Sequence, residues 1–274
     1  MSQRKWWIAA ALVIVVLAGA GAGVLIWRHQ HPSRPAVVAV TPVLDEAIAG
    51  VVEAAGDTAA VTVSGLVPTT ACSGGSIYTR TADLYMDPGN EGAVIAAIAA
   101  SLPASQQPHR AAALGGGAAS LDASLTGGAT LQIIQIDSGW VSATARSGCR
   151  SAGSSATAPS AKAAPAPTAE TLTDETLIGL LTALGTAPAT WRSTAVECAG
   201  SGEGGQIVTV STSSEPTSLD NVPARLAKLA PAGATVFTSP SDRIAWRQGS
   251  VSTVIEAADD GTHLTAQRTT VCSA

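Results

Sequence analysis

The residues in this chain with the clearest covalent chemistry are its four cysteines, Cys72, Cys149, Cys198 and Cys272. None of them forms a Cys-x-x-Cys motif, the spacing typical of a redox pair or of half a zinc site. Widely separated cysteines indicate disulfides instead, and disulfides persist in oxidising compartments outside the cytoplasm. Four cysteines allow three pairings, so the choice between them depends on how the chain is organised.

Three carboxylates are the candidates for acid–base catalysis. Asp83, Glu91 and Asp122 could serve an extracytoplasmic hydrolase if the fold placed two of them in one cleft. The segment Asp87–Glu91 favours a turn and an acidic helix start over a calcium loop, because its spacing does not match that of a calcium loop. The sequence contains neither a Gly-x-Ser-x-Gly elbow nor a P-loop. We therefore predict no catalytic residue, no metal and no cofactor, and a protein that is not an enzyme.

The histidines and tryptophans give few further leads. His29 and His31 form a His-x-His pair, but without additional ligands nearby they indicate polar residues beside a membrane rather than a metal site. His109 and His263 stand alone, which favours structural or solvated roles. Trp140 directly follows a predicted turn, and we take it as a candidate contact residue because aromatic anchors dominate binding interfaces.

The charge of the chain excludes a generally basic nucleic-acid binder. The formal net charge is −5, with 15 basic and 20 acidic residues. Four of the basic residues lie within positions 1–34, so the remainder carries 11 positive against 20 negative charges, a balance of −9. Binding to phosphate backbones requires clustered Lys and Arg. We therefore expect no nucleic-acid partner.

The N-terminus indicates a membrane anchor. Residues 1–5 form a short basic stub, predicted to be cytoplasmic, and residues 6–27 carry no charge over a length that could cross a hydrocarbon core of roughly 30 Å. A cleaved signal peptide is the alternative, although the apolar run continues past the small-residue cleavage signals. Gly19 and Gly23 offer a small-xxx-small surface for anchor-mediated dimerisation. The bulk of the chain is then expected outside the cell membrane.

The external part divides into two halves. Residues 28–40 are a Pro-containing tether, and residues 151–170 are a linker of Ser, Ala, Thr and Pro without large aliphatic side chains. The linker separates a first module, 41–150, from a second, 171–274. The cysteine spacing is 77 residues in the first module and 74 in the second. This similarity, together with the same order of elements, predicts two related modules with the disulfides Cys72–Cys149 and Cys198–Cys272.

Each module is expected to open with an amphipathic helix. Thr41 is the expected cap of the first helix and Gly56 its end, and Thr173 and Gly185 take these roles in the second. Strands are predicted at 60–67, 77–85, 189–196 and 206–211, followed in each module by a second helix (91–102, and a helix that starts near Pro223) and by a strand meander that ends on a cysteine.

Two strand patterns are informative in detail. Between Arg243 and Arg247, alternation places Ile244 and Trp246 on one face of a half-buried strand and the two arginines on the other. Between Leu131 and Ile136, the apolar residues change phase, which indicates a β-bulge or a strand buried on both faces.

The sequence thus predicts an α+β protein: an N-terminal transmembrane helix followed by two tandem, repeat-related modules, each with two helices packed on a mainly antiparallel sheet and one internal disulfide. Two functions fit these features. The first is a non-catalytic, single-pass protein of a bacterial cell envelope, which binds an envelope protein or wall component. The alternative is a hydrolase whose carboxylate pair cannot be recognised from the sequence.

Overall fold

The computed structural model describes residues 40–72, 74–111, 119–150, 174–198, 205–216, 225–226, 228–237, 243–258 and 262–272. The predicted stub, the anchor with Gly19 and Gly23, most of the tether and the linker lie outside these residues. Among the described helices, none is both long and apolar enough to cross a membrane.

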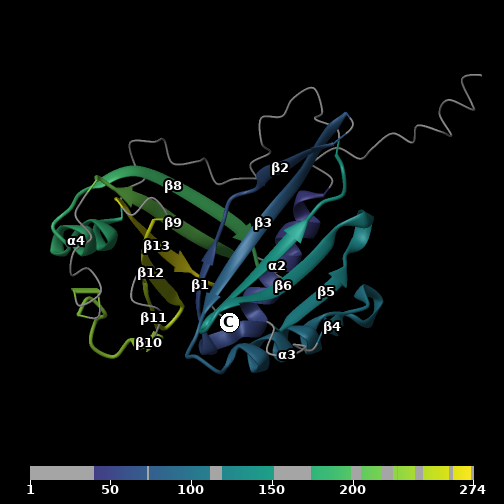
Figure 1. Cartoon of the computed structure of the whole chain (residues 1–274), viewed down its shortest axis with the longest axis horizontal. Coiled ribbons are helices and arrows are strands. Elements are labelled where there is room, and N and C mark those ends of the chain that lie inside the picture. Colours follow the sequence, from purple (N-terminus) through teal and green to yellow (C-terminus); the bar gives the residue numbers. More distant parts are fainter. Residues whose placement is uncertain are drawn as a thin grey trace, which may run out of the picture. The chain divides into compact units, whose positions relative to one another are not determined.

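The first half begins with a helix and continues mainly as strands (Figure 1). Its elements are α2 (Thr41–Ala55), the 3-10 turn η2 (Gly56–Thr58), β1 (Ala60–Val63), β2 (Val67–Cys72), β3 (Gly75–Tyr85), α3 (Glu91–Ser101), η3 (Ala104–Gln106), β4 (His109–Ala111), β5 (Ser120–Ser124), η5 (Thr126–Gly128), β6 (Thr130–Asp137) and β7 (Trp140–Arg146).

The second half repeats this order with fewer turns. Its elements are α4 (Glu175–Ala183), β8 (Pro188–Glu197), β9 (Gln206–Ser214), β10 (Thr235–Phe237), β11 (Arg243–Gln248), β12 (Val251–Ala257) and β13 (Leu264–Thr270). The second helix predicted here is represented by a helical stretch at 225–226, and its start near Pro223 lies outside the described residues.

The fold is a mixed α+β structure with two antiparallel sheets, and the described strands of the two sheets follow the same order. The first sheet is ordered β1-β3-β7-β6-β5-β4, with β2 pairing the other end of β3, and the second is ordered β8-β9-β13-β12-β11-β10. Strands β1 and β2 together occupy the place that β8 fills alone. The shared order agrees with the element order expected from the sequence, while a common origin of the halves stays a prediction.

The two opening helices are found where the sequence predicts them, but both caps differ. Thr41 is the first residue of α2 and Val40 precedes it, without a side-chain cap. In α4 the cap is Asp174 rather than Thr173, because the Asp174 carboxylate accepts hydrogen bonds from the backbone N–H groups of Thr176 and Leu177. A carboxylate also interacts favourably with the positive end of the helix dipole. Gly56 ends α2 with a φ of 54°, a conformation that favours glycine.

The phase change in β6 is a bulge. The register between β6 and β7 shifts between Gln135 and Asp137, so Ile136 is the extra residue. Before the bulge Leu131 and Ile133 face the core, and after it Ile136 is exposed.

One hydrophobic core extends across both halves. Leu44 and Ile48 of α2 belong to the same buried cluster as Val196, Ile207 and Val254 of the second sheet. A smaller cluster lies between α4 and the other face of the second sheet, where Leu177, Leu181 and Trp246 are buried. The second sheet is therefore buried on both faces.

Both disulfides join the predicted cysteines. Cys72 is bonded to Cys149 and Cys198 to Cys272. Cys72 ends β2 and Cys198 directly follows β8, while Cys149 and Cys272 follow the last strand of their halves. Each disulfide therefore ties the first strand region of one half to the end of its last strand.

Candidate functional site

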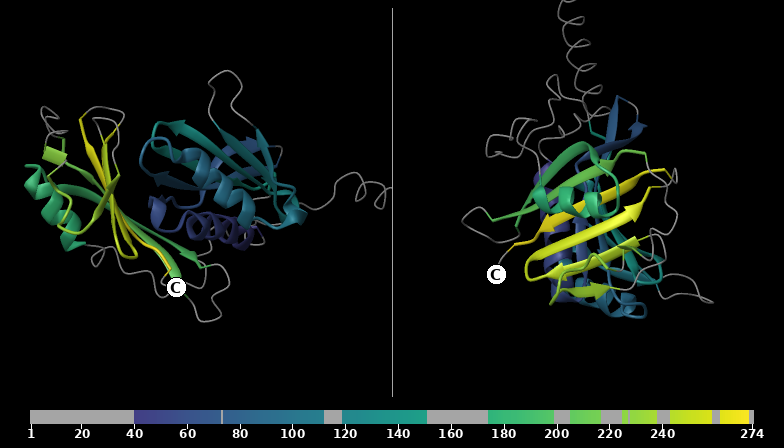
Figure 2. Two further views of the ribbon diagram at one scale, coloured as in Figure 1. Left: turned by 90° about the horizontal axis from the view of Figure 1, so that it is seen from below. Right: turned by 90° about the vertical axis from the view of Figure 1, so that its left-hand side faces the viewer.

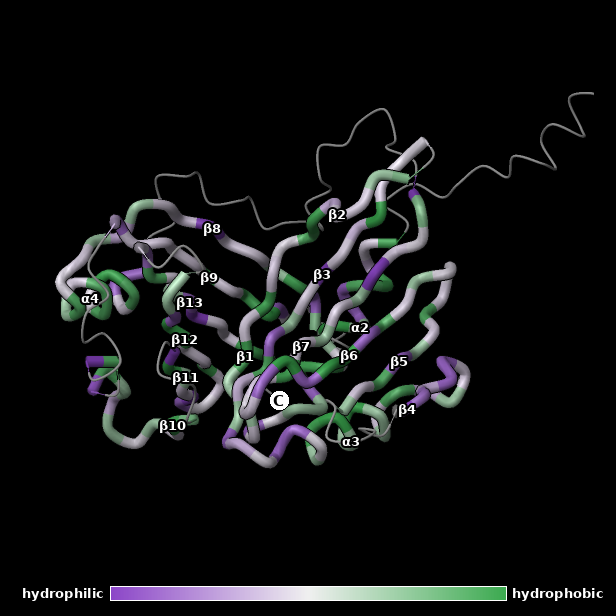
Figure 3. The backbone as a smooth tube through the Cα atoms, viewed as in Figure 1, coloured by the Kyte–Doolittle hydropathy of each residue, from purple (hydrophilic) through white to green (hydrophobic). Residues whose placement is uncertain are grey.

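One face of the first sheet is covered by helices. The other face is exposed along β4, β5 and β6, whereas Thr62 of β1 and Tyr85 of β3 are buried on it. Helices α2 and α3 lie along the covered face (Figure 2), where Leu121, Leu131 and Val141 are fully buried. Residues that alternate with these point to the opposite side, which we call the open face. The alternation is visible as changing hydropathy along β5 and β6 in Figure 3.

Polar side chains are aligned across the open face by the strand register. His109 of β4 lies opposite Asp122 of β5, and Asp122 lies opposite Gln132 of β6. A second row contains Ser124, Thr130 and Arg146. With Gln107, these side chains line a hollow of about 310 Å³, which we call the first-sheet hollow.

The first-sheet hollow presents both hydrogen-bond acceptors and donors. The Gln132 side-chain amide donates to Asp122 at 3.1 Å, which orients the carboxylate and leaves its other lone pairs open. The exposed Arg146 side chain makes no hydrogen bond or ion pair within the described part of the chain. Its guanidinium can therefore engage an anionic ligand in a bidentate contact.

The backbone is unusual at the rim of this hollow. Gln107 has a φ of 48° and is the one described residue other than glycine with a positive φ. A non-glycine residue in the left-handed region costs about 1–3 kcal/mol and is often found at functional sites. It lies two residues before β4 and lines the hollow.

The three predicted carboxylates are not brought together. Asp83 and Asp122 lie on β3 and β5, and β7 and β6 separate these strands in the sheet. Three strand spacings amount to roughly 14 Å, which exceeds the carboxyl separation of about 5–9.5 Å that glycosidases use. Of the predicted candidates, only Asp122 lines the first-sheet hollow.

Glu91 holds a turn. Its carboxylate accepts hydrogen bonds from the backbone N–H groups of Gly139 and Gly89, and so connects the start of α3 to the β6–β7 turn. Burial opposes ionisation of Glu91, but hydrogen bonds from the N–H groups of Gly139, Glu91 and Gly89 outweigh it and lower the pKa. Glu91 is therefore an ionised structural group.

Trp140 lies in a cluster that joins the two halves. Its ring stacks on Tyr85 with the ring centroids 6.1 Å apart, and the Arg243 guanidinium of β11 lies 4.1 Å from the Trp140 centroid. Arg243 Nε is 2.7 Å from a carboxylate oxygen of Glu256, and the Trp140 indole N–H donates to Asp83 at 3.2 Å. This cation–π contact occupies a face of Trp140 within the chain. Its role as a contact residue for a partner stays a prediction.

Asp83 is expected to make the stability of the protein depend on pH. Burial raises the pKa of Asp83, although hydrogen bonds from Ser142 and Trp140 and the charge of Arg243 oppose this effect. The folded protein then holds the proton more tightly than the unfolded chain does. This stabilisation is fully present below the unfolded pKa of about 3.9 and is lost as the pH rises through the higher folded value.

Urea unfolding of the wild type and of Asp83→Asn between pH 3 and pH 8 measures this contribution. The wild type is expected to lose stability relative to Asp83→Asn as the pH rises. Asp122→Asn serves as the control at an exposed carboxylate. Identical pH profiles for the wild type and Asp83→Asn would contradict the assignment.

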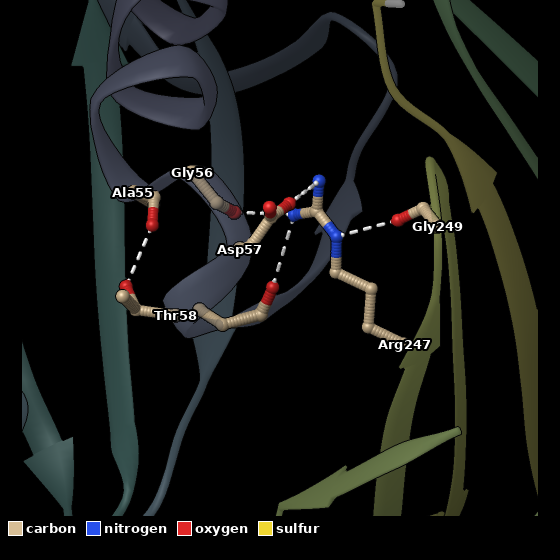
Figure 4. Close-up of polar contacts among 7 residues, drawn as sticks. Ala55, Gly56, Asp57, Thr58, Arg247 and Gly249 are labelled. Atoms are coloured by element: carbon tan, nitrogen blue, oxygen red, sulfur yellow. Dashed lines mark hydrogen bonds and ion pairs between the residues drawn. The ribbon is translucent and has the colours of Figure 1, made fainter. Parts of the chain in front are cut away.

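Arg247 connects β11 to the end of α2 (Figure 4). Its guanidinium donates to the backbone carbonyls of Gly56, Ala59 and Gly249 and lies 2.8 Å from a carboxylate oxygen of Asp57. The Arg247 side chain is 10% exposed, whereas that of Asp57 is 94% exposed. The carbonyl contacts should therefore stabilise this junction more than the ion pair does.

Replacing Arg247 with methionine is expected to lower the free energy of unfolding by about 3 kcal/mol, because three carbonyl groups lose their donor. Asp57→Asn removes only the exposed ion pair and should cost about 0.5 kcal/mol or less. Denaturant unfolding of both variants measures the difference. Equal losses would show that the ion pair, not the carbonyl contacts, stabilises the junction.

Neither metal ligation nor similarity to known proteins identifies the function. In the part of the chain that the structure describes, no three His, Cys, Asp or Glu residues lie together as a metal site would require. The fold and the hollow define a mixed α+β protein with two antiparallel sheets, one disulfide in each half, and a polar surface on the first sheet. Comparison with protein-family models, curated proteins and solved structures found no match.

The sequence indicated Asp122 but not its neighbours. His109 was expected to stand alone, yet the short strand β4 places it opposite Asp122. Gln132 and Arg146 belong to the polar positions of alternating strands, a pattern shared by every strand with one exposed face. The signal that could have grouped them was the pairing of β5 with β6 across the turn at Gly127-Gly128.

Proposed function

We propose that this chain is a non-catalytic binding protein of a bacterial cell envelope, held at the cell membrane by residues 6–27, with its two repeat-related modules outside the cytoplasm. We further propose that the first-sheet hollow binds an acidic polymer of the wall. Two disulfides support an oxidising compartment, since such bonds are rare in the cytoplasm.

The observation that supports this proposal best is a contrast between two sheets with the same strand order, on the face of each sheet that lies opposite its opening helix. In the second sheet, the face opposite α4 carries Ile207 and Val254, which are buried in the core shared with the first half. The corresponding part of the first sheet carries Asp122, Gln132 and Arg146, which are exposed. One face is thus used for internal packing, while the other offers polar groups to a ligand.

The chemistry of the hollow favours a polar ligand with negative groups. Arg146 offers a guanidinium without an acidic partner in the described residues, which suits a carboxylate or phosphate. Asp122 and Gln132 together offer an acceptor and a donor, which suit hydroxyl and amide groups. Acidic wall polymers combine these groups, and a chain with an external charge of −9 needs such a local cation to hold them.

Co-sedimentation of the full chain in nanodiscs with insoluble, purified wall polymer tests the proposal. Binding is expected, with affinity at least about tenfold lower for Arg146→Gln, because a hydrogen-bonded charge pair is lost. Arg192→Gln, an exposed arginine on a strand outside the hollow, is the matched control and should bind like the wild type.

Two results would overturn the proposal. Equal binding by the wild type and Arg146→Gln would show that the hollow is not the site. Turnover in an esterase, peptidase, phosphatase or glycosidase assay, lost on substitution of Asp83, Glu91 or Asp122, would favour the hydrolase instead.

A further inference from the structure

A second hollow lies on the α4 side of the second sheet. It has a volume of about 330 Å³, at the lower end of the roughly 300–1,000 Å³ found for small-molecule sites. We call it the α4 hollow. Leu180, Leu229, Pro231, Val251 and Trp246 supply its apolar lining.

The polar groups of the α4 hollow include Thr176 of α4 and three residues of the sheet. Thr253 and Arg268 lie opposite each other on β12 and β13, and Gln248 ends β11. Arg268 is held in place by Asp174, the cap of α4, at an Nη1–Oδ2 distance of 2.9 Å. Its side chain remains 34% exposed, so one edge of the guanidinium can meet a ligand.

The Trp246 side chain favours a ligand that carries a hydrogen-bond acceptor. The residue is only 3% exposed, and its indole N–H has no hydrogen-bond partner among the described residues; because the nitrogen itself is not fully buried, it can donate to a ligand in the hollow. The same holds for the hydroxyl of Thr253, which is also 3% exposed. The Trp246 indole N–H and the Thr253 hydroxyl, together with the guanidinium of Arg268, could donate hydrogen bonds to an anion with oxygen acceptors.

We propose that the α4 hollow binds a small aliphatic carboxylate, whose oxygens accept from Trp246, Thr253 and Arg268 while its chain contacts Leu180, Leu229 and Val251. This site is separate from the first-sheet hollow and does not depend on the function proposed for it. A cationic amphiphile is excluded by the same chemistry, because it would face Arg268 and an indole N–H with no acceptor to offer.

The test uses the full chain in nanodiscs, labelled with 5-fluorotryptophan, and sodium hexanoate as the probe. The fluorine resonance of Trp246 is identified by its loss in Trp246→Phe. Hexanoate is expected to shift this resonance saturably, while hexylammonium at the same concentrations leaves it unchanged. A shift confined to Trp6, Trp7 and Trp27 would mean that hexanoate only enters the lipid, and it would overturn the proposal.

Variants separate a built site from general partitioning. Arg268→Gln is expected to weaken hexanoate binding about tenfold or more. Because this change also removes the partner of Asp174, Thr253→Val provides a second test that keeps the shape of the side chain. Arg146→Gln, in the first-sheet hollow, is the control and should bind hexanoate normally. Unchanged affinity in Thr253→Val and Arg268→Gln, or equal binding of hexylammonium, would refute the proposal.

Discussion

Replacing Arg80 with methionine is expected to lower the free energy of unfolding by about 4 kcal/mol, since breaking a buried ion pair leaves an uncompensated charge. Arg80 Nε of β3 lies 2.6 Å from a carboxylate oxygen of Asp45 in α2, and both side chains are less than one-tenth exposed. Arg80 also donates to the Ser64 carbonyl at 3.2 Å. The variant therefore leaves the buried Asp45 carboxylate without its positively charged partner and removes the donor from the Ser64 carbonyl.

The pH dependence of this loss identifies its cause. Burial raises the pKa of Asp45. The positive charge of Arg80 lowers this pKa but offsets the effect of burial only in part, and the charge of Glu197 raises it further. Without Arg80, the pKa of Asp45 should rise more. The variant should regain stability below the unfolded pKa of about 3.9, where Asp45 is protonated in both states, and lose it as the pH rises.

A double variant separates the net contribution of the ion pair from the cost of breaking it. Arg80→Met with Asp45→Leu replaces both charges by apolar groups and is expected to restore most of the lost stability, because such replacements are often neutral. Denaturant unfolding of the wild type, both single variants and the double variant completes the cycle. A double variant as unstable as Arg80→Met would show that packing, not the stranded charge, causes the loss.

Local patterns in the sequence predicted most of the elements. The strand from Arg243 to Arg247 alternates as expected, with Ile244 and Trp246 in the cluster beneath α4. Alternation cannot say what lies on the other face, however. The two arginines were expected on the exposed face of a half-buried strand, but Arg243 lies over Trp140 and Arg247 bonds to the end of α2. Both contacts join residues more than a hundred positions apart.

The first-sheet hollow could not be predicted for a related reason. Its residues come from four strands and from Gln107 before β4, and the alignment of the strand residues depends on which strands are neighbours. A one-residue change of register would move Gln132 from the open face to the core. The bulge at Ile136 was visible as a change of phase, but its effect on the neighbouring strand was not. The separation of Asp83 from Asp122 likewise follows only from the order β3-β7-β6-β5.

Removing the first disulfide with Cys72→Ser and Cys149→Ser is expected to lower the free energy of unfolding by about 4 kcal/mol. The bond closes a sequence separation of 77 residues, and in the chain-entropy model a loop of this size restricts the unfolded chain by about that amount. The matching change at Cys198 and Cys272, with a separation of 74 residues, should cost nearly the same. Adding a reductant to the wild-type protein should reproduce both losses together.

Because the core is shared, the loss should not stay within the first half. Unfolding of α2 would expose Val196, Ile207 and Val254, which pack in the same cluster. The fluorescence of Trp140 and of Trp191, each followed in a variant that lacks the other five tryptophans, should therefore report one transition at a lowered denaturant concentration. A transition that moves for Trp140 but not for Trp191 would show that the halves unfold independently. Their common cluster would then contribute little to the stability of the second half.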